Sequence, residues 1–289
     1  MAGLNSGRHV SWQMWVAGAY FAINVALVLV SYPLDGGPDW DLWSALADSI
    51  ARGAMYDTRT EAPFVWSPVA GWFMSLVPTL IGYWPWYALH IGVVFLMRDW
   101  RLIAITLVTA GIWIDAAMGN TFTFIFVAGV LAYRGSRPAA LVYLALLLLI
   151  PRPLQLPLAA WLLWKMPAVR LPFVGMAVVH TLAVLASGYA FDWIGALSAQ
   201  QANGNFGPTA LFGVWWFIVG IPLATWLTLK GHVGFAGLAA SPYLLGVYWL
   251  MPAIELPRPY ADRSESKADS GDETEAPPRP RGLSSSSIP

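Results

Sequence analysis

The chain has 289 residues, of which 57% are hydrophobic and only 11% are charged, and its formal net charge is zero. A soluble domain carries about 25% charged residues, so this composition predicts an integral membrane protein rather than a soluble globule. The zero net charge argues against nucleic acid as a partner. The absence of cysteine excludes disulfides and thiolate metal sites.

The apolar runs are continuous rather than alternating, which predicts helices rather than strands. A crossing takes about 20 mostly apolar residues, so we expect an all-α polytopic bundle of about eight to ten transmembrane helices. Several segments are short, which favours broken or re-entrant helices around a cavity. The predicted segments are 12–31, 64–80, 84–97, 102–118, 121–133, 138–150, 154–164, 172–190, 211–229 and 233–254.

Three regions follow from this pattern. Residues 1–11 are expected to be a cytoplasmic N-terminus, and 12–254 the membrane domain. The run 12–31 is too long for a signal peptide and is expected to be retained as the first span. Residues 255–289 are rich in Pro, Ser, Asp and Glu and predict a disordered polar tail.

The loop 32–63 holds six acidic and two basic residues, which places it on the outer face by the positive-inside tendency. Within it, Trp43, Leu46, Ala47 and Ile50 have helical spacing. They predict a short amphipathic helix along the membrane surface that ends near Gly53.

Three basic loops are predicted to lie on the cytoplasmic side of the membrane. If each apolar run between them crosses once, the turn at 119–120, Arg152 and the loop 189–208 lie on the outer side. The three basic loops hold Arg134 with Arg137, Lys165 with Arg170, and Lys230. Arg98 and Arg101 conflict with this count, because two crossings between 62 and 98 would leave them outside.

Several motifs occur along the chain in an order that resembles the motif order of glycosyltransferase family 87. Asp39 is followed by an aromatic residue four positions later, by Gly53, by Tyr56 and then by the run Phe64-Val65-Trp66-Ser67-Pro68. The likeness continues at Gly119-Asn120, at Arg152-Pro153 and at 203–211, and so covers most of the membrane portion. The sequence departs from the family at Trp66, where Tyr is usual, at Asn120, where Gln is usual, and in its shorter length.

The resemblance implies a GT-C-type membrane enzyme that moves a hexose, mannose first among the candidates, from a polyprenyl-phosphate donor to a lipid-linked or cell-surface acceptor with inversion. It implies the plasma membrane of a bacterium, with the active site on the outer face. Such a donor carries its own leaving group, so one carboxylate base and one cation for the phosphate suffice, and no cofactor or metal is expected.

Asp39 is the predicted general base, because it matches the loop aspartate of the family. The alternative is that Asp39 is a solvated loop residue or the N-cap of a helix that begins near Trp40. Asp41 is the second candidate for the base. Arg152 lies between two prolines and is predicted to bind the donor phosphate, with Gln155 as a helper, while the alternative is a loop arginine that reaches the headgroups.

The remaining candidates are polar or aromatic residues that could contact the sugar or the lipid. They are Asn120, His180, Asn205, Trp43, Tyr56 and Trp66, with Asp115 as a further ionisable group inside a predicted span. Interface belts, helix contacts and loop formation would explain the same residues without a substrate. A non-catalytic transporter or lipid-handling protein is the competing interpretation of the whole chain.

Overall fold

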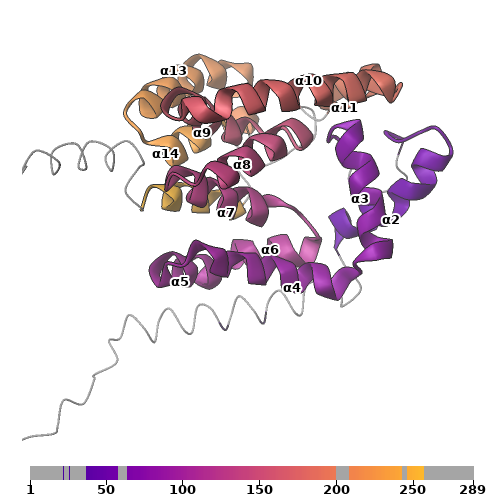
Figure 1. Cartoon of the computed structure of the whole chain (residues 1–289), viewed down its shortest axis with the longest axis horizontal. Helices are drawn as coiled ribbons and strands as arrows, with labels where there is room; N and C mark the ends of the chain where they lie inside the picture. The colour runs from indigo at the N-terminus through magenta and orange to yellow at the C-terminus, as the bar shows by residue number, and fades with distance from the viewer. Residues whose placement is uncertain are drawn as a thin grey trace, which may run out of the picture.

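The computed structural model describes residues 22, 26, 37–57, 64–199, 208–242 and 246–256 (Figure 1). Over these residues the chain is all-helical, with 13 α-helices joined by short turns and 3-10 segments. Apart from residues 22 and 26, the predicted first span at 12–31 lies outside the described residues, as do Asn205 and the tail from 257. The α-helices are α2 Pro38–Ala51, α3 Pro68–Leu80, α4 Tyr83–Val94, α5 Trp100–Val108, α6 Ala110–Met118, α7 Phe122–Tyr133, α8 Arg137–Leu149, α9 Leu156–Lys165, α10 Arg170–Ala186, α11 Ala190–Ala199, α12 Pro208–Phe212, α13 Trp216–Leu229 and α14 Val233–Ala240.

Helix α7 forms the centre of the main core. Ten of its 12 residues are buried, and it packs against α8, α9, α4 and the 3-10 segment η6, Gly246–Glu255. A helix that is apolar on all sides is expected at such a central position. Most of the other helices run roughly side by side with it, whereas α3 stands across them (Figure 1).

One helix is long and apolar enough to cross a membrane, the 20-residue run Pro167–Ala186 that contains α10. Two bent pairs, α3 with α4 and α5 with α6, would raise the number to three if each pair is a single span. A 12-residue helix such as α7 is only about 18 Å long, against a hydrocarbon core of about 30 Å. Over the described residues these lengths do not show a bundle of eight to ten spans.

Two of the predicted segments are interrupted. The segment 102–118 is two helices, bent by 68°, because Thr109 is extended at φ −78° and ψ 121°. The segment 233–254 breaks after α14, where Ser241 is extended and precedes a proline, which disfavours helical geometry in the residue before it.

The bend of 112° between α3 and α4 bears on the conflict at Arg98 and Arg101. Gly82 turns the chain there with φ +80°. Beyond α4, Asp99 lies 2.7 Å from Arg134, and Arg134 also donates to the carbonyl of Met97. The Arg98–Arg101 turn therefore lies beside the basic loop at Arg134.

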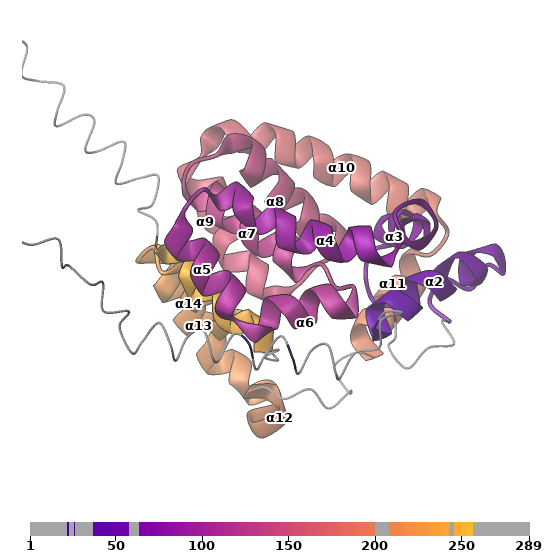
Figure 2. The same ribbon diagram turned by 90° about the horizontal axis from the view of Figure 1, so that it is seen from below.

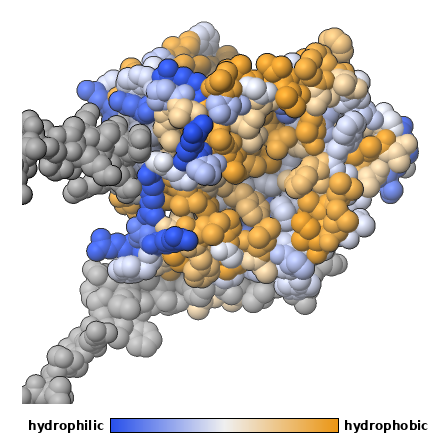
Figure 3. All heavy atoms as spheres, in the orientation of Figure 1, coloured by the Kyte–Doolittle hydropathy of each residue, from blue (hydrophilic) through white to orange (hydrophobic). Residues whose placement is uncertain are grey.

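The face of the molecule seen in Figure 3 is strongly apolar over its middle and right, whereas hydrophilic side chains gather mainly at its left. Along α10, large aliphatic side chains are mostly exposed, for example Leu171 at 81% and Val179 at 67%. Large exposed apolar areas of this kind mark a membrane or a partner surface.

Glu255, the first residue of the predicted tail, belongs to the helical part of the chain. Glu255 is the last residue of η6, and its carboxylate accepts hydrogen bonds from the backbone N–H groups of Gly234 and Phe235 at 2.8 and 3.1 Å. Its other oxygen lies 3.0 Å from Nδ1 of His232. Glu255 thus satisfies the first free N–H groups of α14, which a composition change alone does not reveal.

Candidate functional site

The first turn of helix α2 packs against the end of α6. A Cβ on Gly37 would lie 2.6 Å from the Cα of Met118, and a Cβ on Gly119 would lie 3.1 Å from the backbone N of Trp40. Gly119 also has φ +82°, which glycine adopts without strain. The two glycines let the first turn of α2 pack directly on this junction. In both views α2, α3 and α11 lie at one end of the molecule (Figures 1 and 2).

The predicted amphipathic helix is present as α2, and Gly53 follows its end with φ +70°. Trp43 and Leu46 are fully buried, but Ala47 is exposed and Ser49 is buried in its place. The buried face packs against α3 rather than lying free along a membrane surface.

Asp39 lies in the first turn of α2 and is partly buried. The N-cap is Gly37, followed by Pro38 at the first helical position, so Asp39 is neither the cap nor a loop residue. Burial raises the pKa of Asp39 to about 6; the charge of Arg152 lowers this pKa and that of Asp115 raises it. Asp41 is exposed, so the two candidate bases have different surroundings.

Arg152 follows α8 in an extended turn and is only 7% exposed. Its backbone N–H donates to Oε1 of Gln155 at 3.1 Å. Its guanidinium donates to Oδ1 of Asn120 at 2.6 Å and to the hydroxyl of Tyr248 at 3.2 Å. The prolines on both sides stop helix formation at this point and leave the arginine on a bend. Asn120 and Arg152, far apart in sequence, are thus in direct contact, and Asp39 is close enough to interact with the charge of Arg152; we call these residues and their hydrogen-bond partners the polar cluster.

Asn120 is 7% exposed, and its side-chain oxygen also accepts from the backbone N–H of Thr121 at 2.7 Å. Two donors on one atom identify that atom as the oxygen of the amide. Gln155 is fully buried, and its Nε2 has no hydrogen-bond partner among the described residues. A buried amide with free N–H groups suits a negatively charged ligand nearby.

The aromatic candidates belong to a separate cluster beside α2. Trp43 is fully buried, with ring centroids 5.8 Å from Trp66 and 5.2 Å from Trp86. Tyr56 donates to the carbonyl of Trp66 at 2.8 Å, and burial and the charge of Asp192 raise its pKa. Trp43 is therefore packed inside the aromatic cluster, and none of its ring is exposed in this structure.

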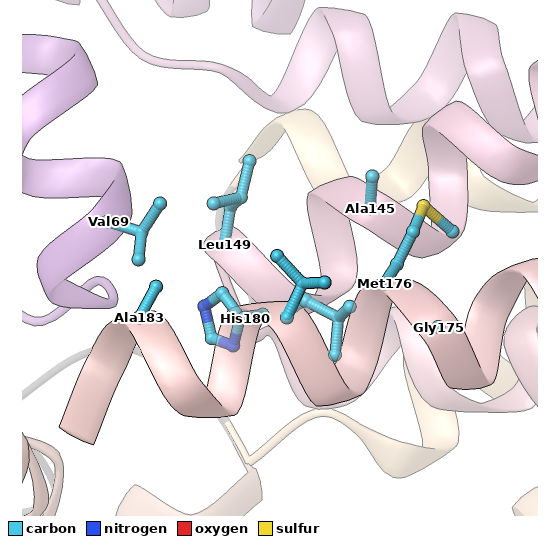
Figure 4. Close-up of a pocket in the computed structure, with 9 residues that line it drawn as sticks. Val69, Ala145, Leu149, Gly175, Met176, His180 and Ala183 are labelled. Carbon is cyan, nitrogen blue, oxygen red and sulfur yellow. The ribbon is translucent and has the colours of Figure 1, made fainter. Parts of the chain in front are cut away.

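His180 lies apart from the polar cluster. It lines an open apolar groove of about 340 Å³ between α3, α8 and α10, close to Val69 and Leu149 (Figure 4). Its Nε2 is buried without a hydrogen-bond partner among the described residues. The groove reaches Leu149, three residues before Arg152.

Two members of the polar cluster were not anticipated. Tyr248 is 1% exposed and contacts Arg152 from η6, and no sequence signal points to it. His90 is fully buried in α4, and an ionisable residue inside an apolar segment is a signal that the sequence did carry. Within the described residues, no group of three or more His, Asp or Glu side chains could hold a metal ion.

No family model, curated protein or solved structure matches the chain.

Proposed function

We propose that the chain is a membrane glycosyltransferase that moves a hexose, with mannose as the first candidate, from a polyprenyl-phosphate donor to a lipid-linked or cell-surface acceptor. One observation carries this proposal. A partly buried carboxyl with a pKa of about 6, on Asp39, lies within electrostatic range of a buried guanidinium, on Arg152. The motif resemblance to glycosyltransferase family 87 supports the same assignment.

The proposed reaction needs only these two groups. Asp39 takes the proton of the acceptor hydroxyl, and the acceptor oxygen forms a bond to the anomeric carbon of the sugar. On the opposite face the bond from this carbon to the phosphate oxygen breaks, and the electron pair leaves with the polyprenyl phosphate. Because the new bond forms opposite the old one, the configuration inverts. A base with a pKa near the working pH is efficient in such a transfer.

Arg152 is assigned to the phosphate, whose negative charge grows as the bond breaks. Its guanidinium is held in place by Asn120 and Tyr248, so little reorganisation is needed when the phosphate arrives. The unpartnered N–H groups of Gln155 are assigned as further donors to the phosphate. Asn120 already accepts from Arg152, so we assign it to the arginine rather than to a sugar hydroxyl.

The proposal includes a multi-pass arrangement in the cell membrane. The turn at Arg98 and Arg101 meets the loop at Arg134, and Tyr133 donates to the carbonyl of Gly231 next to Lys230, so three basic turns gather at one end. The positive-inside tendency assigns this end to the cytoplasm. Asp39 and Arg152 then lie at the outer end, where the phosphate of a lipid donor meets water.

A transfer assay tests the function. Wild type and the variants Asp39→Asn, Asp41→Asn and Asp48→Asn are reconstituted with radiolabelled polyprenyl-phosphate mannose and a lipid acceptor extract. We expect loss of transfer of about 100-fold or more in Asp39→Asn alone, because general-base catalysis contributes about 10²–10⁴. Asp48 is exposed on the same helix and serves as the matched control.

The three variants separate the alternatives. If Asp41→Asn loses transfer and Asp39→Asn does not, the base is Asp41. If wild type consumes no donor with any hexose on the carrier, the assignment as a transferase is wrong, and lipid movement across the vesicle becomes the activity to measure.

A further inference from the structure

His90 has an acceptor at each ring nitrogen. Its Nδ1 lies 2.9 Å from the carbonyl oxygen of Trp86, and its Nε2 lies 2.5 Å from the carbonyl oxygen of Asn120. A carbonyl oxygen only accepts, so both nitrogens must donate, and only the imidazolium carries two N–H groups. The two contacts therefore fit an imidazolium better than either neutral tautomer, on a side chain that is fully buried.

Asp115 supplies the opposite charge. Its Oδ2 lies 4.0 Å from Nε2 of His90 and accepts from the backbone N–H and the hydroxyl of Thr123 at 2.7 and 2.6 Å. Its Oδ1 is buried without a hydrogen-bond partner among the described residues. Buried ion pairs of this kind often contribute little to stability compared with apolar residues of the same size, so a role in stability alone explains this one poorly.

Asn120 connects this pair to Arg152. Its backbone N–H donates to the carbonyl of Asp115 at 2.9 Å, and its carbonyl accepts from His90. Its side-chain oxygen accepts from the guanidinium of Arg152. The backbone of Asn120 is thus held on one side by the imidazole of His90 and on the other by the main chain at the end of α6, and its side chain contacts the guanidinium.

We propose that His90, charged and paired with Asp115, is a positioning residue that holds Asn120 so that Asn120 orients the Arg152 guanidinium for a lipid phosphate. The lipid phosphate rests on the proposed function, whereas the charge on His90 and the orientation of Arg152 do not. His90 acts through Asn120 and touches no reacting atom.

The first test is the charge on the ring. The chain has four histidines, so selective ¹⁵N labelling gives few ring signals, and His90→Gln identifies that of His90. We expect both ring nitrogens of His90 to show imidazolium shifts at pH 7.5 in lipid nanodiscs. Asp115→Asn should move the signal toward a neutral ring. A neutral His90 in the wild type would overturn the proposal.

The second test follows the guanidinium of Arg152. Its N–H signals, identified with Arg152→Lys, should exchange slowly with water in the wild type. Protection should fall about tenfold or more in His90→Gln and in Asn120→Ala, since a charge-assisted bond lost at either step frees the guanidinium. His232→Gln, an exposed histidine at the other end, is the matched control. Unchanged protection in His90→Gln would also overturn the proposal.

The third measurement separates this inference from the proposed function. Undecaprenyl phosphate is titrated into the same nanodiscs, and affinity is expected to fall about tenfold in Asn120→Ala and in His90→Gln. Because His90→Gln leaves the carboxylate of Asp115 buried without its counter-charge, this variant should melt below the control, and its binding is measured well below that melting temperature. If the wild type binds no lipid phosphate, the proposed function fails, and the exchange of the Arg152 signals still decides whether His90 positions this side chain. Equal affinity in wild type and both variants would refute the positioning role.

Discussion

Replacing Asp39 with asparagine removes one charge and keeps the size of the side chain. With a pKa of about 6, the wild-type carboxyl is ionised to about 10% at pH 5, to half at pH 6 and to about 90% at pH 7. If Asp39 is the base, kcat/KM for transfer should rise about ninefold between pH 5 and pH 7 and level off above pH 7. Asp39→Asn should lose this rise together with most of the activity.

The same raised pKa predicts that the free energy of unfolding falls as the pH rises, whereas the transfer activity increases. The folded state binds the proton of Asp39 more tightly than the unfolded state, whose carboxyl titrates near 3.8. The stabilisation from the protonated group is present below about pH 4 and is lost as the pH rises through 6. At pH 7 the ionised carboxyl costs up to about 3 kcal/mol. Asp39→Asn should therefore melt at a higher temperature than the wild type at pH 7 and at a similar temperature near pH 4.

The assay combines the two readouts on one preparation. Transfer rates at low donor concentration are measured from pH 5 to pH 8, and thermal unfolding in detergent is followed at pH 4 and pH 7. A loss of activity without a loss of stability rules out misfolding as the cause. A flat pH profile between pH 5 and pH 7, or a melting temperature of Asp39→Asn below that of the wild type at pH 7, would refute the reasoning.

Three further predictions concern the frame around the site. Gly119→Ala should destabilise the chain by about 2 kcal/mol and reduce transfer, because Ala is strained at φ +82° and its Cβ would press on Trp40; thermal unfolding and the transfer assay measure both effects. Since the chain has no cysteine, Arg101→Cys and Asp48→Cys can be labelled singly in sealed vesicles with an impermeant maleimide, and we expect them on opposite sides; labelling from one side would contradict the orientation. Glu255→Ala should cost about 1 kcal/mol in an unfolding experiment, since the first N–H groups of α14 lose their acceptor, and an unchanged melting temperature would argue against this cap.

Local features of the fold follow from the sequence. The helical spacing of Trp43, Leu46 and Ile50 predicts α2, and the glycine at position 53 predicts its end. The prolines on both sides of Arg152 predict the bend that separates α8 from α9. Each of these depends on neighbouring residues, whose steric effects are readable along the chain.

Features that depend on tertiary contacts do not follow from the sequence. Apolar composition does not distinguish a helix that crosses from one that lies across its neighbours. The sequence predicts a break between 80 and 84, but not the angle of 112° between α3 and α4. The exposure of Ala47 and the burial of the Trp43 ring depend on which face α3 covers. The meeting of His90, Asp115 and Arg152 depends on the relative positions of two helices and the turn after α8, for which no local pattern exists.

The most direct test of the central claim is a structure of the chain with a non-transferable polyprenyl-phosphonate sugar in lipid nanodiscs. We expect density for the phosphonate against the guanidinium of Arg152 and the sugar on the side of Asp39, with the lipid chain leaving toward the apolar exterior. A phosphonate bound elsewhere, away from the guanidinium of Arg152, would contradict the proposed function.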